Sequence, residues 1–245
     1  MAQLCLRTIE HMDELLGFRP EVELKVLLPD DWSAHTDFPV YGMPHYTSAN
    51  VLVMAAVNNA MWDSFIPPMD KVPAESAREI RRVYGTPDGG ISMQPFFDLL
   101  VLHELGHAYH LQKPAPTLRK WLDEQFCNIL LHTFIAEREP ARLDALTLMP
   151  RMVVDAGSEG FVFTTLRQLE ENYDIVGQQH PRNYGWYQCR WHKAAADIHH
   201  EVGDLALRRL WAFQLSAPGD LSDAELARRL EHDVHPAMAR VMTGW

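Results

Sequence analysis

Apolar side chains in the first third of the chain follow both helical and strand-like spacing. Between residues 3 and 16 they recur every three or four positions and stop at Gly17, which predicts a helix with a glycine at its C-terminal end. Residues 22–26 alternate with period two, and residues 51–57 form a continuous apolar run, so both segments are expected to be strands. This part of the chain therefore predicts mixed α and β structure.

Helical spacing dominates the rest of the chain. The predicted helices cover residues 73–83, 94–111, 117–138, 140–150, 158–172 and 181–215. Several of them have a proline near the start or just beyond the end. A capping box that begins at Ser222 predicts one more helix. Thr117 is the expected N-cap of the third of these helices. We predict an α+β lobe over residues 1–112 and a mostly helical lobe over residues 113–245, divided by the loop near residues 112–117.

Composition and charge narrow the classes of function. The 245 residues suffice for one large domain or for two lobes around a cleft, and 47% of them are hydrophobic. A formal charge of −11 with no basic stripe disfavours nucleic-acid binding. No apolar run is long enough to cross a bilayer and the first residues do not form a signal peptide, so we expect a cytoplasmic protein without a membrane partner.

The number and spacing of the cysteines are consistent with a cytoplasmic protein. Cys5, Cys127 and Cys189 are far apart and form no Cys-x-x-Cys pair, which favours reduced thiols. Their spacing also fails to supply the clustered ligands of a structural zinc site.

The segment His103-Glu104-Leu105-Gly106-His107 carries the clearest chemistry in the chain. Histidines four residues apart lie one turn above each other on a helix, so both imidazoles can bind one metal ion. Glu104 projects roughly 100° away from His103, where a carboxylate can reach a water on the metal without being a ligand. Two buried imidazoles and a buried carboxylate are costly without a cation, so we predict a zinc site.

A catalytic zinc site needs a third protein ligand, and Glu124 is our first candidate. It comes 17 residues after His107, on the next predicted helix, and a short proline-containing turn can fold that helix back against the first. Asp123 is the competing candidate, because it would point from a neighbouring face of the same helix.

This pattern resembles the gluzincins, the thermolysin-like superfamily in which a His-Glu-x-x-His helix precedes a Glu-bearing helix. The resemblance extends to Glu124-x-x-x-Asn128 and implies that Asn128 orients a ligand imidazole. The chain does not match the metzincins, which would require Gly at position 110 and His at position 113. The segments 102–110 and 124–128 also look like the ImmA/IrrE metallopeptidases, a local similarity over about 40 residues.

The gluzincin resemblance implies a zincin-like α+β fold and further site residues. Such enzymes have a Tyr or His in the C-terminal lobe that stabilises the oxyanion, and Tyr187 is the first candidate, followed by Tyr184 and then His192. The resemblance also implies that a strand within residues 46–57 runs along the cleft and binds peptide, whereas the sequence equally allows an ordinary core strand.

We therefore expect a zinc metallopeptidase. Zinc would lower the pKa of a bound water to about 7, and Glu104 would serve as the general base. Two alternatives remain open: a zinc hydrolase that acts on other amides or esters, and a non-enzymatic zinc-containing binding module.

Overall fold

The computed structural model describes residues 1–113 and 116–245 and has a mixed α+β fold that is mostly helical. The strands are β1 (Glu23–Leu27), β2 (His45–Tyr46) and β3 (Val51–Ala55). The α-helices are α1 (Ala2–Leu16), α2 (Pro29–His35), α3 (Ala60–Asp63), α4 (Ala74–Tyr84), α5 (Gln94–Phe97), α6 (Val101–Gln112), α7 (Lys120–Arg138), α8 (Leu143–Asp155), α9 (Leu166–Gln179), α10 (Pro181–Val202), α11 (Leu205–Ser216), α12 (Asp223–Arg229) and α13 (Pro236–Thr243). Shorter helical turns are η1 (Asp98–Leu100), η2 (Pro140–Arg142) and η3 (Leu230–Val234).

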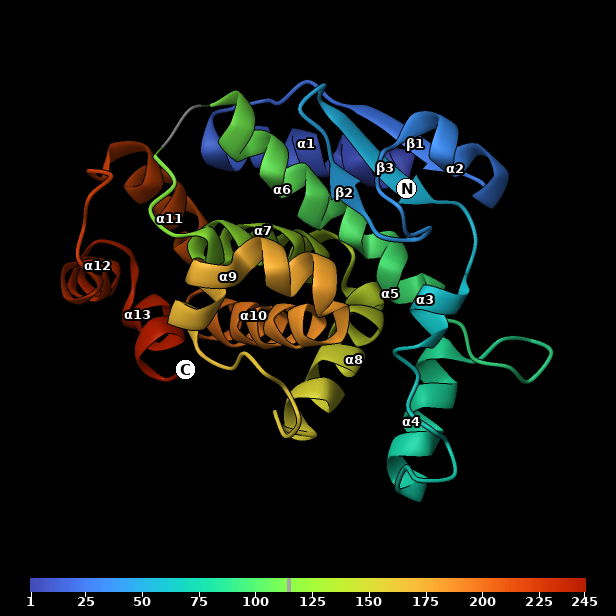
Figure 1. The fold of residues 1–245 in the computed structure, drawn as a ribbon. Helices are drawn as coiled ribbons and strands as arrows, with labels where there is room; N and C mark the ends of the chain where they lie inside the picture. Colours follow the sequence, from blue (N-terminus) through green and yellow to red (C-terminus); the bar gives the residue numbers. More distant parts are fainter. Residues whose placement is uncertain (114–115) are drawn as a thin grey trace.

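The strands form one small mixed sheet in the order β1-β3-β2. β3 is central and buried along its whole length, which explains its continuous apolar run, and it pairs in parallel with β1 and antiparallel with β2. Figure 1 shows the sheet in the same upper part of the molecule as α1 and α6, with α7, α9 and α10 below. The strands predicted at residues 22–26 and 51–57 are confirmed, with slightly different ends.

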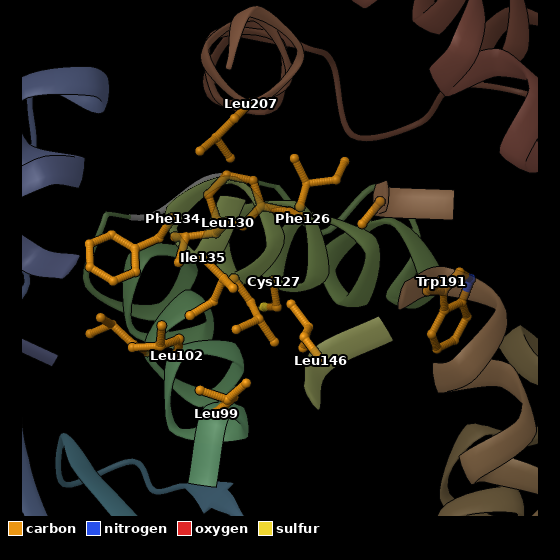
Figure 2. Close-up of a cluster of buried hydrophobic side chains, with 14 of the residues drawn as sticks. Leu99, Leu102, Phe126, Cys127, Leu130, Phe134, Ile135, Leu146, Trp191 and Leu207 are labelled. Carbon is orange, nitrogen blue, oxygen red and sulfur yellow. The ribbon is translucent and has the colours of Figure 1, made fainter. Parts of the chain in front are cut away.

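α7 is the central helix of the hydrophobic core. Its apolar residues, including Phe126, Leu130 and Phe134, are fully buried and surrounded by side chains from α6, α8, α10 and α11 (Figure 2). α6 packs on α7 and also contacts α1, β2 and β3, so it joins the sheet to the helical part of the molecule.

A glycine allows α6 and α7 to approach closely. A Cβ atom built on Gly106 would lie only 2.8 Å from the Cα atom of Cys127. Backbone atoms this near leave no room for a side chain, so Gly106 sets the distance between the two helices.

Several helix ends differ from the prediction. α7 begins at Lys120 with Arg119 as N-cap, so Thr117 does not cap it. The single helix expected over residues 181–215 is two helices, because Gly203 adopts φ 64 at the end of α10 and redirects the chain. α9 begins eight residues later than the segment predicted from residue 158, after the capping box of Thr165 and Gln168.

Two larger features of the fold, an additional helix and the division into lobes, also bear on the prediction. The polar stretch after residue 28 contains the short helix α2, which the sequence pattern did not predict. The division into lobes at residues 112 and 113 stays a prediction, and its loop includes residues 114–115, which lie outside the described residues. In the described ranges, every helix is too short or too polar to cross a membrane.

The close approach at Gly106 predicts a loss of stability on Gly106→Ala. Overpacking of this kind typically costs about 1–3 kcal/mol, more than the helix propensity gained from alanine. The control is Gly177→Ala in α9, where a Cβ would meet nothing within 4 Å, and this change should add about 0.5–1 kcal/mol. Urea denaturation of both variants measures the free energy of unfolding, and an undiminished value for Gly106→Ala would refute the packing account.

Candidate metal centre and its cavity

α6 presents His103 and His107 on its face toward a cavity of about 450 Å³. Their ring centroids are 5.1 Å apart, as expected for residues one helical turn from each other. Glu104 lines the same cavity and is 9% exposed. Leu102, Leu105 and Tyr109 of α6 are packed in the core, which fixes the direction of the polar face.

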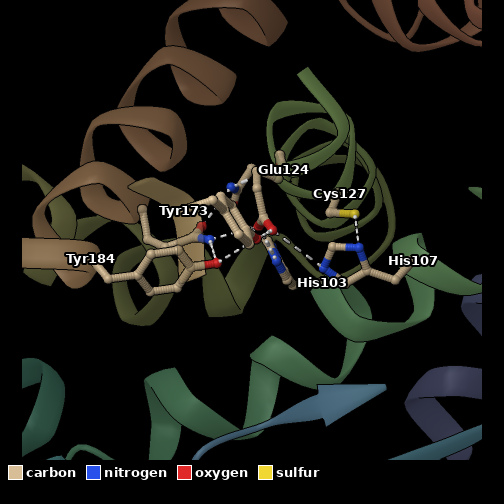
Figure 3. Close-up of polar contacts among 8 residues, drawn as sticks. His103, His107, Glu124, Cys127, Tyr173 and Tyr184 are labelled. Carbon is tan, nitrogen blue, oxygen red and sulfur yellow. Dashed lines mark hydrogen bonds and ion pairs between the residues drawn. The ribbon is translucent and has the colours of Figure 1, made fainter. Parts of the chain in front are cut away.

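Glu124 of α7 lies opposite the two histidines. Its Oε2 atom is 3.1 Å from Nε2 of His103, and its Oε1 atom is 3.8 Å from Nε2 of His107. Figure 3 shows this carboxylate between the imidazoles on one side and two tyrosines on the other. Burial alone would raise the pKa of Glu124, but His107 and His103 outweigh it and hold that pKa well below the usual range.

Asn128 determines which nitrogen of His103 carries a proton. Its Nδ2 group donates to the Glu124 backbone carbonyl and to Oε1 of Gln188, each at 3.0 Å. Its Oδ1 atom must therefore be the atom that faces Nδ1 of His103 at 3.2 Å, so that Nδ1 is the donor. The resemblance had implied such an orienting role, and the structure places Asn128 against the His103 ring.

The position of the proton on His103 bears on whether a metal ion fits between His103 and Glu124. With the proton on Nδ1, the lone pair of His103 Nε2 faces the Glu124 carboxylate, and two acceptors cannot bind each other. A second proton on the imidazole or a shared cation resolves this contact. Two imidazoles and a carboxylate are also ligands that zinc accepts, so the donor set fits the ion.

Residues that the sequence did not single out complete the surroundings of Glu124. The Tyr173 hydroxyl of α9 donates to Oε1, and Nε2 of Gln188 in α10 donates to Oε2 at 2.6 Å. Gln188 lies one turn after Tyr184, a spacing that could have indicated a shared face, and it also donates to the Tyr184 hydroxyl at 2.9 Å. No sequence signal pointed to Tyr173.

The structure does not bring Tyr187 to this cavity. Its ring is fully buried and stacks on Trp245, and its hydroxyl donates to the Thr165 carbonyl at 2.8 Å. The cavity face of α10 follows a helical stripe made of Pro181, Tyr184, Gly185, Gln188, Cys189 and His192. Tyr187 lies off this stripe, whereas the second and third candidates, Tyr184 and His192, lie on it.

His192 is a buried, neutral neighbour of the histidine pair. Its ring centroid is 6.4 Å from that of His103, and its Nδ1 atom has no hydrogen-bond partner among the residues that the structure describes. Burial, with His103 nearby, lowers the pKa of His192 well below its ordinary value. It therefore faces the cavity as an uncharged imidazole.

Asp123, the competing third ligand, points elsewhere. It does not line the cavity, and it accepts a hydrogen bond of 3.1 Å from Nε2 of Gln214 in α11. Burial raises its pKa to about 7. The structure thus separates the two adjacent carboxylates, with Glu124 at the histidines and Asp123 at α11.

Cys127 is another residue near the two histidines whose side chain could bind a metal ion. The donor atoms of His103, His107 and Cys127 all lie within 4.8 Å of one another, and the thiol sulfur is 3.5 Å from Nδ1 of His107. This thiol lies at the opposite ring edge of His107 from Glu124 and does not line the cavity. Burial and nearby carboxylates raise the pKa of this thiol well above its usual value.

The cavity itself is largely apolar. Its walls come from the sheet side through Met43, Pro44 and Tyr46, and from the aromatic pair Phe96 and Phe97. The edge strand β2 reaches the cavity through His45 and Tyr46, whereas β3 is paired on both sides. Only the first part of the strand expected over residues 46–57 is therefore in a position to contact a ligand.

Comparisons with known proteins identify no relative. No protein-family model matches the chain, and neither a curated protein sequence nor a solved structure is significantly similar to it. Any statement about function must therefore rest on the residues of the site.

The Asn128 contact predicts that Asn128→Ala weakens zinc binding by about 10- to 100-fold, because His103 loses the acceptor that orients its ring. A titration against a zinc chelator measures the affinity. Asn183→Ala is the control, since Asn183 is also a buried amide but binds the Phe163 backbone. Equal affinities of wild type and Asn128→Ala would contradict the orienting role.

Proposed function

We propose that the protein is a zinc-dependent hydrolase that cleaves peptide bonds, with His103, His107 and Glu124 as the metal ligands. The strongest support is the convergence of the two Nε2 atoms on the Glu124 carboxylate at the wall of a cavity that Glu104 also lines. A purely structural zinc site needs no such carboxylate beside it. Glu104 makes no hydrogen bond or ion pair with the described residues, so its oxygens can bind a water.

The reaction follows from the positions of these groups. When bound, zinc supplies Lewis-acid activation of the attacking water and of the substrate carbonyl. Glu104 accepts the proton of that water and later passes it to the leaving amine. The apolar walls exclude bulk water, which strengthens each electrostatic interaction at the reacting atoms.

Tyr184 is the proposed hydrogen-bond donor to the oxyanion. The single hydroxyl hydrogen of Tyr173 is engaged by Glu124, and the Tyr184 oxygen lies 3.2 Å from the Tyr173 oxygen. Tyr184 is therefore the donor in this contact. The acceptor is a neutral hydroxyl oxygen, so the Tyr184 hydrogen can turn to a developing negative charge, which is the stronger acceptor. Tyr184 thus takes the role that the gluzincin resemblance had implied first for Tyr187.

The edge of the sheet favours a peptide over other amides and esters. Among the described residues, β2 pairs with β3 alone, and its two residues line the cavity. Its other edge can therefore pair with an extended chain. A zincin-like fold is proposed on the same grounds: an antiparallel edge strand, the histidine helix α6 and a following helix that bears the third ligand.

The Cys127 thiol supports a second candidate, a non-enzymatic zinc protein. A site made of His103, His107 and Cys127 would hold zinc without using Glu124. The two candidates differ in their third ligand, which mutagenesis can identify.

Metal analysis of purified variants should distinguish them. Wild type should hold one zinc per chain, and His103→Ala or Glu124→Ala should lose it, because each removes a direct ligand. Cys127→Ser and Asp123→Ala should keep it. Zinc retained by Glu124→Ala and lost by Cys127→Ser would favour the non-enzymatic candidate instead.

Replacement of the general base should abolish hydrolysis while the metal stays. Glu104→Gln keeps the side-chain volume but cannot accept a proton, so cleavage of a peptide library should slow by at least about 10²- to 10⁴-fold. Asp174→Asn is the control, since Asp174 also lines the cavity but lies on α9. If Glu104→Gln cleaves as fast as wild type, the mechanism is wrong.

The tyrosine assignment predicts opposite results for two neighbouring residues. Tyr184→Phe should lower kcat by about 10²- to 10³-fold, the typical effect of one lost oxyanion donor, with little change in KM. Tyr187→Phe should leave both constants unchanged, because its hydroxyl binds Thr165 outside the cavity. Steady-state kinetics on a peptide identified in the library measures kcat and KM for both variants. A lower kcat for Tyr187→Phe with no change for Tyr184→Phe would instead identify Tyr187 as the donor.

A further inference from the structure

A second cavity, of about 420 Å³, lies between the end of α8, one face of α10 and α13. It shares no lining residue with the histidine cavity, although α10 forms a wall of both. Its α10 wall includes Trp186, Arg190 and Ala194, residues four positions apart that form one stripe of the helix. The C-terminal helix α13 lies beside α10 and closes the other side (Figure 1).

The walls of this cavity combine apolar side chains with charged ones. Val154, Ile198 and Val241 contribute aliphatic surface, and Trp186 and Trp245 contribute aromatic surface. A cavity of this size with apolar walls and a few polar groups is typical of a site for a small organic molecule.

Two of the three cations at the cavity already have carboxylate partners. Lys193 binds Asp197 at 2.7 Å, and Arg240 forms an ion pair with Glu201. Arg190 differs, since it forms no ion pair and no hydrogen bond with any residue in the described ranges 1–113 and 116–245. A half-buried cation without an anion is the unusual feature of this cavity.

The position of Arg190 leaves its donors available. Its guanidinium carbon lies 4.0 Å from the ring centroid of Trp245 and 5.2 Å from that of Trp186. A cation–π contact with the indole rings does not use the guanidinium N–H groups as hydrogen-bond donors, so they can bind a carboxylate. Burial lowers the pKa of Arg190.

We propose that this cavity binds a small monocarboxylate with an apolar body, whose carboxylate pairs with Arg190. One uncompensated cation balances one negative charge, which favours a monocarboxylate over a phosphate dianion. The aliphatic and indole walls favour an apolar body. This site is independent of the zinc centre and of the proposed hydrolysis.

Isothermal titration calorimetry of the full chain with octanoate tests the proposal. One octanoate should bind per chain, and octanamide, its neutral isostere, should bind at least about tenfold more weakly because a charge-assisted contact is lost. Inorganic phosphate should not compete. Arg190→Gln should weaken octanoate binding by at least about tenfold, whereas Arg182→Gln, which removes an exposed arginine of the same helix, should not.

A second variant keeps the test independent of any effect of Arg190 on folding. Ala194→Phe retains Arg190 but fills the cavity, so it should abolish the binding of octanoate. Equal affinities for octanoate and octanamide, full binding by Arg190→Gln or Ala194→Phe, or no octanoate binding by wild type would each overturn the proposal.

Discussion

The contact between α6 and α7 at Gly106 and Cys127 is the constraint on which the candidate site depends. A Cβ at Gly106 would lie 2.8 Å from backbone atoms of α7, so the two helices pack closer than side chains normally allow. Because Glu124 lies one turn before Asn128 on α7, this packing presents both residues to the His103 ring. The geometry of the candidate metal site is therefore a consequence of helix packing, and the apolar faces of α7 supply the free energy that holds it.

A buried polar cluster of this kind is stable only when its charges are compensated. The Glu124 carboxylate is 3% exposed and is surrounded by two imidazoles, the Tyr173 hydroxyl and the Gln188 amide. Each donor offsets part of the desolvation of the carboxylate. The Nε2 atom of His103 still faces Glu124 as an acceptor unless a proton or a metal ion lies between them, and a metal ion there is the basis of the proposed hydrolysis.

The sequence predicted the residues whose chemistry depends on local spacing. His103, Glu104 and His107 are placed by one helix, and Glu124 by the next, so periodicity and a short turn were enough to bring them to one cavity. The two strands predicted from the pattern differ from β1 and β3 only at their ends, whereas the pattern did not predict the two-residue strand β2. In contrast, the break at Gly203 depends on the backbone conformation of one glycine, and the pattern of apolar residues on either side does not reveal it.

The choice between Tyr184 and Tyr187 needed the tertiary structure. Both tyrosines occur in the first turns of α10. In the same turns, the rings of Trp186 and Tyr187 pack against Trp245, which lies far away in the sequence. Because aromatic residues occupy more than one face of this helix, its periodicity does not say which face meets the cavity. Tyr173 and Gln188 reach Glu124 only through the packing of α9 and α10 on α7, which no local motif encodes.

X-ray absorption at the zinc edge, on wild-type protein loaded with one equivalent of the metal, tests the central claim most directly. Coordination by two histidines and Glu124 predicts nitrogen and oxygen neighbours only, at about 2.0–2.2 Å. A sulfur neighbour at about 2.3 Å would show that Cys127 is the ligand and would contradict the account.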